Sequence, residues 1–411
     1  MEIYKFGPAA AAAFALLAGC GGENNNSVPP PVTLPTPAPT PAPTPAPAPT
    51  PDARPIVGLN QSATIAQIST PWDIAVLPDS RILASSRTIP GTMTLVSTTG
   101  TKVNVSGLPD SVGMLDILLS PDFANTGLVY FTYMFQDRSA PRVGRAKDDP
   151  TIFPEGVAIA KGILSGSSFT SVQTIFRTDP IVSPNRIGEP GARLALSPDG
   201  RDLYMTSGDR QEEDFAYLFL LDNNVGKIIR IHTDGTIPTD NPWFNIPGAA
   251  TENWSRGHRN PYGLAFSSDG FLWSSEHGPK GGDEFNVIAA GVNYGWPAAS
   301  NGDQYSGVPI PDHTPGDGFI APIITWTPAI APAGMVRYNG NEFLDWNNDF
   351  LITGLQQRGI IRVRTKNTEA TEMQRIDLGA RIRSIAISQD GAIYIITDGE
   401  MGDIKRVTPI R

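Results

Sequence analysis

The densest polar stretch of the chain runs from Trp254 to Pro297 and contains WSRGHRNPYG followed by SSEHGPKGGDEFNVIAAGVNYGWP. Its Gly-Pro, Gly-Gly and Asn-Tyr-Gly steps break regular secondary structure, and irregular backbone can turn carbonyl oxygens towards a cation. Asp283 and Glu284 supply carboxylates beside that backbone. Hard oxygen ligands of this kind suit Ca²⁺, although the spacing is not that of an EF-hand. Acids that face solvent or cap turns would explain the same pattern equally well.

Two groups of basic residues have the spacing of anion-binding sites. Arg259 is followed by Asn260 and Pro261 in a β-rich loop, where the first two side chains can donate N–H groups to an anion. Arg381 and Arg383 alternate along an expected strand, so their side chains leave the same face. Two parallel guanidinium groups clamp a carboxylate well. Spacing by itself also fits a solvent-facing pair.

Several common catalytic motifs are absent from the sequence. There is no GxSxG elbow, no Walker loop and no HExxH, and the lone Gly281-Gly282 pair is not a dinucleotide fingerprint. Serine hydrolases, NTPases and nicotinamide enzymes are therefore disfavoured. His258 and His277 lie too far apart for a local histidine-pair metal motif. We interpret His258 as a structural hydrogen-bonding residue.

The elements that must position these residues are short β-strands. An apolar strand, a turn with Pro-Asp or Asp-Gly, and a second apolar strand recur as a hairpin signal. The copies begin at Ile74, Ile117, Leu194, Leu264 and Ile385, and a degenerate sixth begins at Phe343. Recurrent hairpins predict an all-β protein with radial repetition, here a six-bladed β-propeller. A pair of β-sandwiches or a large barrel is the alternative architecture. The loops that include Asp148 to Ser171 and Asp312 to Ile320 are expected to shape the substrate mouth.

The composition of the 411-residue chain excludes several classes of function. The 31 Lys and Arg oppose 41 Asp and Glu, which gives a formal net charge of −10. No basic cluster is present, so a nucleic-acid partner is disfavoured. A hydrophobic content of 40% suffices for a large core. The single cysteine excludes a disulfide framework, a CxxC redox pair and a thiolate zinc site.

The first 55 residues differ from the rest of the chain. Residues 1–19 have the lysine, short apolar run and small residues of a secretory signal, and Leu17-Ala18-Gly19-Cys20 resembles a bacterial lipobox. We expect lipid on Cys20 and a periplasmic protein whose only membrane contact is this anchor; an ordinary signal peptide is the alternative. Residues 20–55 form a Pro/Thr/Ala-rich linker, expected to be an extended polyproline-II tether. The folded body is expected at residues 56–411.

Four strings in this body resemble a known family. GHRNPYGLAF, EHGPKGGDEFN, GVNYGWP and RIRSIAISQDGAIYIITD are similar to segments of the soluble aldose sugar dehydrogenases, which are quinoproteins of the glucose/sorbosone dehydrogenase group. The resemblance extends from about Pro71 to Pro409. It implies a six-bladed β-propeller that holds pyrroloquinoline quinone (PQQ) through calcium at the blade tops. It also implies a sugar or alcohol substrate and an unidentified periplasmic electron acceptor.

The resemblance assigns roles to individual residues. Arg259 and Asn260 would contact the quinone, Tyr305 in QYSG would contact the cofactor, and Arg381 and Arg383 would grip its carboxylates. Asp398, in ITD, ends the same blade as the two arginines.

Two calcium sites are implied by the same resemblance. Gly278 and Pro279 would offer main-chain carbonyls to the calcium of the cofactor. Glu284 and the backbone of Tyr294 would belong to a second, structural calcium site. A calcium that serves stability alone would use the same ligands.

Three positions depart from the family pattern. Glu189 stands where the family has its catalytic histidine, Ser111 replaces a glutamine, and Gln356 replaces a cofactor-binding lysine. A glutamate can act as the base when its environment tunes its pKa, so we predict Glu189 as the base of a PQQ enzyme. The alternative is a propeller that has lost its chemistry and serves as a binding module of the cell envelope.

Overall fold

The computed structural model describes residues 56, 58–140, 153–181, 188–212 and 215–411. The expected signal peptide (1–19), the linker (20–55) and Cys20 lie outside these residues. Within the described ranges, no helix is both long enough and apolar enough to cross a membrane.

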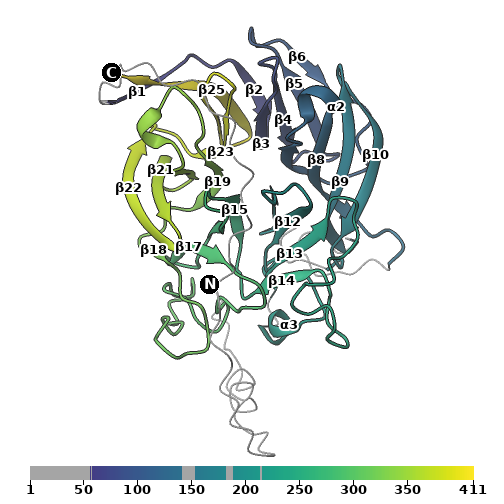
Figure 1. Ribbon diagram of the computed structural model, residues 1–411, viewed down its shortest axis with the longest axis vertical. Coiled ribbons are helices and arrows are strands. Elements are labelled where there is room, and N and C mark those ends of the chain that lie inside the picture. Colours follow the sequence, from purple (N-terminus) through teal and green to yellow (C-terminus); the bar gives the residue numbers. More distant parts are fainter. Residues whose placement is uncertain (1–55, 57, 141–152, 182–187, 213–214) are drawn as a thin grey trace, which may run out of the picture.

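The strands of the described chain form six antiparallel sheets, which are the blades of a propeller (Figure 1). Blades 1 to 5 each contain four consecutive strands. Blade 1 contains β3 (Pro71–Val76), β4 (Ile82–Ser86), β5 (Thr92–Val96) and β6 (Lys102–Asn104), and blade 2 contains β7 (Met114–Leu119), β8 (Leu128–Gln136), β9 (Glu155–Ser165) and β10 (Ser168–Arg177). Blade 3 contains β11 (Gly191–Leu196), β12 (Asp202–Ser207), β13 (Lys227–His232) and β14 (Asn253–Arg256), blade 4 contains β15 (Pro261–Phe266), β16 (Leu272–Glu276), β17 (Asp283–Ile288) and β18 (Ile324–Trp326), and blade 5 contains β19 (Pro332–Arg337), β20 (Phe350–Gly354), β21 (Gly359–Lys366) and β22 (Glu369–Asp377). Two short α-helices, α2 (Phe123–Thr126) and α3 (Phe215–Phe219), lie in connections.

Blade 6 joins both ends of the described chain. β23 (Ile382–Ile387), β24 (Ile393–Thr397) and β25 (Met401–Ile410) pair in order, and β25 also pairs with β1 (Gly58–Gln61) and β2 (Ala66–Ser69). The first strands of successive blades contact one another from β3 round to β23, and β23 returns to contact β3. Figure 1 shows β3, β15, β19 and β23 near the middle and β6, β10 and β22 at the periphery. The predicted six-bladed propeller is therefore confirmed, and the sandwich and barrel alternatives are wrong.

Five of the six predicted hairpins coincide with the first two strands of a blade. The sixth is misplaced, because Phe343 does not begin a strand. It is followed by the 3₁₀ helix η2 (Leu344–Trp346), and the first strand of blade 5 has already ended at Arg337. Phe343 and Trp346 are buried in the apolar cluster between blades 5 and 6, so their burial reflects helical packing and not strand pairing. The loop expected at Asp148 to Ser171 is also wrong in its described part, since β9 and the start of β10 occupy it.

A Ser-x-Asp-Gly turn explains why several of these hairpins form. In the turn after β11, the Ser197 hydroxyl donates to Asp199 Oδ1 at 2.6 Å, and the Gly200 N–H donates to the Ser197 carbonyl at 2.8 Å. Gly200 has φ +75°, a left-handed conformation that glycine adopts without a Cβ penalty. The turns that contain Gly270 and Gly391 repeat the pattern with φ +89° and +87°. Local residue chemistry thus sets the register of each hairpin.

The apolar core lies between the faces of neighbouring blades. One cluster, for example, packs Leu83 and Met93 of blade 1 against Phe131 and Ala158 of blade 2. Because each blade buries both faces in this way, the ends of the strands are left free to carry polar groups.

A buried ion triplet ties four blades together. Arg193 NH1 lies 3.0 Å from Asp73 Oδ1 and 2.6 Å from Asp116 Oδ1, while Arg193 Nε donates to the Tyr262 carbonyl at 3.0 Å. These four residues come from the first strands of blades 1 to 4. Burial, and then Asp73, raise the pKa of Asp116 to about 7.

Candidate active site

Most predicted site residues lie at one end of the blades. In an antiparallel hairpin, the start of the first strand lies beside the end of the second, as Gly191 beside Ser207 and Pro261 beside Glu276 show. The predicted residues before or at the start of a first strand are Ser111, Glu189, Arg259, Asn260, Arg381 and Arg383, and those just after a second strand are Gly278, Pro279 and Gln356. The fold therefore brings residues from five blades to the same face of the propeller.

Glu189, the predicted base, is held in a strained backbone next to a cation. Its φ is +46°, which is uncommon for a residue other than glycine. Its Oε1 accepts from Arg259 NH2 at 2.7 Å, and its side chain is only 13% exposed. The buried Oε2 has no N–H or O–H donor among the described residues. A Cβ on Gly208 would lie against the Glu189 carbonyl, so this loop conformation requires glycine at position 208.

Asp209 lies beside Glu189 and forms a carboxyl pair with it. Burial, and then the neighbouring Glu189, raise the pKa of Asp209 well above its usual range, and the two side chains lie within hydrogen-bonding reach. Asp209 Oδ2 accepts from Trp296 Nε1 at 2.9 Å and Oδ1 accepts from the Gln211 N–H at 2.8 Å. A proton on Asp209 can be donated to Glu189 Oε2. Burial and Glu189 therefore both favour the protonated form of Asp209, while Arg259 lies beside Glu189.

Arg259 links the carboxyl pair to the glycine-rich loop of blade 4. Its NH1 donates to the Gly278 carbonyl at 2.9 Å, and its guanidinium carbon lies 5.4 Å from the ring centroid of Trp296 and 6.0 Å from that of Tyr305. Tyr305 is 73% exposed, which places it at the rim of the site. Asn260 is buried, and its Oδ1 accepts from the Gly191 N–H at 3.3 Å.

The two predicted clamp arginines both bind Asp398. Arg381 donates to Asp398 Oδ2 from Nε and NH2 at 3.0 and 2.9 Å, and Arg383 donates to Oδ1 at 2.8 and 2.6 Å. Arg383 is 7% exposed at its side chain and Arg381 is 50% exposed. The solvent-facing interpretation of the pair therefore fails for Arg383.

A third arginine joins this pair. Arg87 lies over Trp72, with its guanidinium carbon 5.1 Å from the ring centroid, and Arg383 lies over the same ring at 5.4 Å. Burial, and then the positive charge of Arg383, lower the pKa of Arg87. Arg87 Nε is buried without a hydrogen-bond partner in the described part of the chain. Two guanidinium groups thus bind Asp398, and that of Arg87 lies close to Arg383 over the same ring, so three positive charges gather around this carboxylate.

Ser111 and Gln356, two of the three positions that depart from the family pattern, do not contact the arginine cluster or the carboxyl pair in the described part of the chain. Ser111 Oγ contacts Met114 Sδ at 3.4 Å and lines a hollow of about 180 Å³ with Gln136, Arg138 and Arg177, among others. Gln356 lies in the turn after β20 with an exposed side chain, and its N–H donates to the Ile330 carbonyl at 3.0 Å.

The glycine-rich loop after β16 has carbonyl groups gathered in a small space. A Cβ on Gly278 would lie closer than 3.0 Å to the carbonyl oxygens of Gly281 and Gly282. Asp283 caps this loop, because its two oxygens accept from the N–H groups of Gly278 and Ala331 at 2.9 and 2.6 Å. The turn-capping interpretation is therefore correct for Asp283. Burial raises its pKa to about 6.

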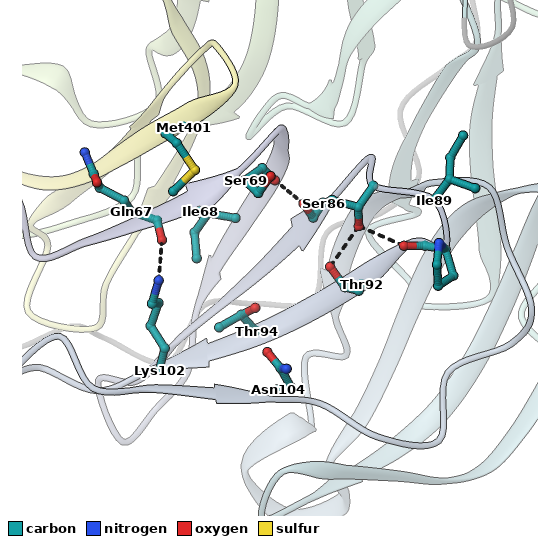
Figure 2. Close-up of a pocket in the computed structure, with 12 residues that line it drawn as sticks. Gln67, Ile68, Ser69, Ser86, Ile89, Thr92, Thr94, Lys102, Asn104 and Met401 are labelled. Atoms are coloured by element: carbon teal, nitrogen blue, oxygen red, sulfur yellow. Dashed lines mark hydrogen bonds between the residues drawn. The ribbon is translucent and has the colours of Figure 1, made fainter.

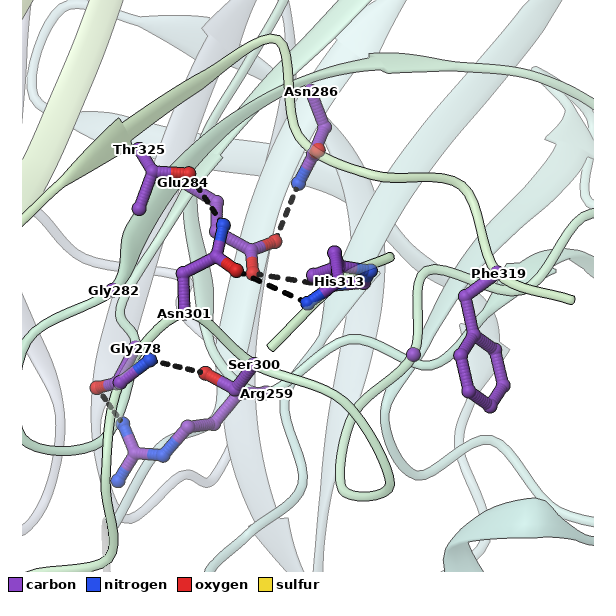
Figure 3. Close-up of polar contacts among 12 residues, drawn as sticks. Arg259, Gly278, Gly282, Glu284, Asn286, Ser300, Asn301, His313, Phe319 and Thr325 are labelled. Carbon is purple, nitrogen blue, oxygen red and sulfur yellow. Dashed lines mark hydrogen bonds and ion pairs between the residues drawn. The ribbon is translucent and has the colours of Figure 1, made fainter. Parts of the chain in front are cut away.

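Glu284 remains available as a cation ligand. Burial, and then Glu276, raise the pKa of Glu284 well above its usual range. Its Oε2 accepts from Asn286 Nδ2 at 3.0 Å, and Oε1 faces His313 (Figure 3). The Tyr294 hydroxyl donates to the Val287 carbonyl at 2.6 Å, so only the backbone of Tyr294 is free to bind a cation.

His258 has the structural role expected of it. Its Nδ1 lies 2.9 Å from Glu276 Oε1 and its Nε2 lies 2.8 Å from Ser255 Oγ. Both ring nitrogens are therefore used, and the ring also stacks on Tyr294.

A larger hollow of about 410 Å³ lies between blades 1 and 6 (Figure 2). Gln67 and Met401 line one side, and Thr94, Lys102 and Asn104 line the other. The Lys102 ammonium is already bound to the Gln67 carbonyl at 3.1 Å. None of the predicted site residues lines this hollow, and we place the site at the strand ends instead.

Sequence reasoning missed Asp209 and Arg87. The predicted hairpin from Leu194 ends in Ser-Gly-Asp, whose last residue is Asp209, so its position after a second strand was a usable signal. Arg87 follows β4 in the same way. Neither has a local motif, because their partners are Glu189 and Arg383, which lie far away in the sequence.

Comparisons with known proteins agree with this architecture. A family model described as Glucose / Sorbosone dehydrogenase matches residues 68–406. The aldose sugar dehydrogenase YliI of Escherichia coli is 34% identical over 356 residues, which cover 84% of this chain and 91% of that protein. The crystal structure of the soluble aldose sugar dehydrogenase from Escherichia coli in its apo-form is 32% identical, with a TM-score of 0.75 over 86% of this chain and 100% of that one. The PQQ-bound aldose sugar dehydrogenase of Streptomyces coelicolor is 26% identical, with a TM-score of 0.63 over 86% and 98% of the two chains.

The family match thus covers nearly the whole described body, including all six blades and the residues at their ends. This chain belongs to the glucose/sorbosone dehydrogenase family.

Proposed function

We propose that the protein is a PQQ- and calcium-dependent dehydrogenase that oxidises an aldose sugar or a related alcohol. The relatives from Escherichia coli and Streptomyces coelicolor support this class of reaction. The observation that carries the proposal is the proximity of a cationic cluster to a carboxyl pair. Tyr262 lies between them: its ring centroid is 5.0 Å from that of Trp72, over which Arg87 and Arg383 lie. Burial raises the pKa of its hydroxyl, on which the charges of Arg383 and Glu189 also act.

The cationic cluster fits a polyanionic cofactor. PQQ carries three carboxyl groups, and Asp398 is the carboxylate that binds the Arg381 and Arg383 guanidinium groups and whose charge also acts on Arg87. The unpartnered Nε of Arg87 is a further donor that such a ligand would satisfy. Arg381 and Arg383 would hold the carboxylates, and Arg259, Asn260 and Tyr305 would contact the quinone side. PQQ, when bound, supplies a quinone that accepts a hydride.

The carboxyl pair supplies the base for this reaction. Oxidation of an alcohol removes a hydride from carbon and a proton from the hydroxyl group, and the proton needs an acceptor at the site. Glu189 accepts it on the carboxylate that Arg259 orients. The neighbouring Asp209, whose pKa is raised by burial and then by Glu189, gives this base a carboxyl partner in the same buried site. Arg259 also neutralises charge on the substrate oxygen as the proton leaves.

Calcium is proposed beside the cofactor and at a second site. Gly278 and Pro279 would supply carbonyl oxygens to the first ion, in the loop where the carbonyls of Gly281 and Gly282 also gather. Glu284 and the Tyr294 carbonyl would hold the second. These are hard oxygen donors, as Ca²⁺ requires.

Replacement of the base tests the proposal. Glu189→Gln keeps the size of the side chain but removes the proton acceptor, so turnover should fall by about 10² to 10⁴ while PQQ still binds. Turnover with an aldose panel and an artificial acceptor, alongside PQQ absorbance, measures both quantities. Full turnover by this variant with PQQ bound would refute Glu189 as the base.

A tethered binding module is the second candidate function. The exposed Gln356 and the Ser111–Met114 contact favour it, because neither side chain donates charge to the cationic cluster. A protein that binds an envelope carbohydrate but neither PQQ nor calcium would support this candidate over the enzyme.

We further propose that the protein is exported, lipidated on Cys20 and held in the periplasm, where an unidentified acceptor receives its electrons. The lipobox-like Leu17-Ala18-Gly19-Cys20 and the proline-rich linker support this placement. Cys20→Ala should move the protein from the membrane fraction to the soluble fraction. Unchanged membrane association would contradict the anchor.

A further inference from the structure

The indole of Trp296 contacts both groups that surround Glu189. Its Nε1–H donates to Asp209 Oδ2 at 2.9 Å, and its ring centroid lies 5.4 Å from the guanidinium carbon of Arg259. Arg259 in turn lies 2.7 Å from Glu189 Oε1. One side chain thus reaches the carboxyl partner of Glu189 through a hydrogen bond, and its cationic partner through the face of the ring.

Packing fixes the position of this indole. Trp296 is buried in an apolar cluster that also contains Leu218, Val225 and Ile310. The ring of Phe215, from α3, lies edge-on to it with 6.3 Å between centroids, and the Trp296 backbone N–H donates to the Gly257 carbonyl at 3.1 Å. A donor that is held in this way from several sides can keep a reacting group in one orientation.

Asp209 is the group on which this donor acts most directly. Its Oδ1 accepts from the Gln211 N–H at 2.8 Å, while its own backbone N–H donates to the Arg259 carbonyl at 2.7 Å. The Trp296 N–H binds the other carboxyl oxygen, Oδ2, so both oxygens have a fixed donor. Each donor stabilises the ionised form of a buried carboxyl group more than the protonated form.

Three charged groups act on Asp209 besides these neutral donors. The charge of Glu189 favours the protonated form of Asp209, whereas the charge of Arg259 favours the ionised form. Arg210, the next residue in the chain, also interacts electrostatically with Asp209. Because the opposing charges of Glu189 and Arg259 meet here, a neutral donor that fixes Asp209 sets the balance between them.

We propose that Trp296 is a positioning residue for proton transfer, which holds Asp209 by its N–H and Arg259 by its ring and so fixes Glu189 beside them. It acts through these residues and exchanges no proton itself. The inference rests on the proposed function for the role of Glu189 as the base.

Trp296→Phe tests the inference, because it keeps an aromatic ring and removes only the N–H donor. The pKa of Asp209 should rise by about one unit or more, since its ionised form loses a hydrogen bond. Infrared spectra recorded against pH measure this pKa from the carboxyl C=O band that Asp209→Asn removes. With PQQ bound, kcat should fall about tenfold, while KM and PQQ affinity change by less than about threefold.

A second tryptophan provides the matched control. Trp326 Nε1 donates to Glu372 Oε2 at 2.7 Å, between blades 4 and 5. Trp326→Phe therefore removes the same kind of indole–carboxylate hydrogen bond away from Glu189. It should leave both kcat and the pKa of Asp209 unchanged.

An unchanged pKa of Asp209 or an unchanged kcat in Trp296→Phe would overturn the inference. If this variant does not fold, NMR of the wild-type protein replaces it. One of the seven tryptophan Nε1–H resonances should then shift with pH as Asp209 titrates, and Asp209→Asn should abolish that shift. The absence of such a resonance would overturn the inference as well. The infrared and NMR readouts need neither substrate nor PQQ, so a wild-type protein that oxidises no sugar would contradict the proposed function alone.

Discussion

At the level of single residues, the chemistry of this site depends on two carboxyl groups with different partners. Glu189 pairs with Arg259, whereas the carboxyl group of Asp209 accepts hydrogen bonds from the neutral donors Trp296 and Gln211. Burial and the adjacent Glu189 therefore raise the pKa of Asp209. Environments that separate the pKa values of paired groups are typical of acid–base sites.

The raised pKa of Asp209 predicts a pH dependence of stability. The folded protein keeps a proton on Asp209 that the unfolded chain has lost above about pH 4, so the free energy of unfolding falls as pH rises from there towards the folded pKa. Asp209→Asn removes this pH-dependent contribution to the free energy of unfolding. The stability of the variant relative to wild type should rise between pH 5 and pH 7, by up to about 1.4 kcal/mol per pH unit. Urea unfolding at both pH values measures it.

Asp240→Asn is the control, because Asp240 is exposed and should leave the pH profile as it is in wild type. Parallel profiles for Asp209→Asn and wild type would contradict a shared proton.

Single residues were predictable from the sequence where a local motif surrounds them. Glu189 stands out because the segment that follows it matches the family, and Arg381 and Arg383 stand out by their alternation. Asp209 and Arg87 have no such motif. Their importance comes from burial next to residues that are distant in the chain, which only the closed propeller brings together.

At the level of elements, glycines in the Ser-x-Asp-Gly turns set the hairpins, but their surroundings differ. Gly200 has φ +75°, and no described atom lies within 4 Å of the position of a Cβ. Gly391 has φ +87°, and a Cβ there would lie closer than 3.0 Å to the backbone nitrogen atoms of Asn341 and Glu342. The same turn is thus open in blade 3 and tightly packed in blade 6.

Replacing each of these two glycines by alanine should lower the free energy of unfolding by different amounts. Gly200→Ala adds only the left-handed backbone penalty, about 1–2 kcal/mol. Gly391→Ala adds a backbone clash to that penalty, so we expect it to cost about 3 kcal/mol or more. Urea unfolding of the two variants measures the difference. Equal costs would show that the contact with Asn341 and Glu342 is relieved without strain.

Elements were predictable where turn chemistry is explicit. Five hairpins carry Pro-Asp or Asp-Gly turns and were placed correctly. The sixth lacks such a turn, and its apolar residues Phe343 and Trp346 resemble a strand although they pack from a 3₁₀ helix. An apolar pattern alone does not separate these two possibilities.

At the level of the whole molecule, the ion triplet of Asp73, Arg193 and Asp116 connects the first strands of the blades. One guanidinium group serves two buried carboxyl groups, and the Ser384 hydroxyl of blade 6 donates to Asp73 as well. Contacts of this kind join first strands that belong to different sheets. Ring closure was predictable from the repeat, but this network was not, because its members look like ordinary strand residues in the sequence.

Removal of the shared cation should destabilise the ring. Arg193→Met leaves two buried carboxyl groups without their partner, at a cost of about 3–5 kcal/mol near pH 8. The pKa of Asp116 is raised to about 7 even with Arg193 present, so Asp116 is protonated at pH 5 and the cost there should be smaller. Thermal and urea unfolding at both pH values test this expectation, with Arg81→Met as the control, because Arg81 pairs with Asp79 on the surface. The same cost at both pH values would contradict it.

Binding of PQQ with and without Ca²⁺ is the measurement that tests the whole account most directly. Metal-free protein is titrated with PQQ while the absorbance of the cofactor and the thermal midpoint are recorded, and Arg383→Gln serves as the comparison. We expect saturable, calcium-dependent binding that raises the midpoint, and a loss of about tenfold or more in PQQ affinity when one charged clamp residue is removed. The absence of binding at micromolar PQQ at any calcium concentration would contradict it and would favour a tethered binding propeller.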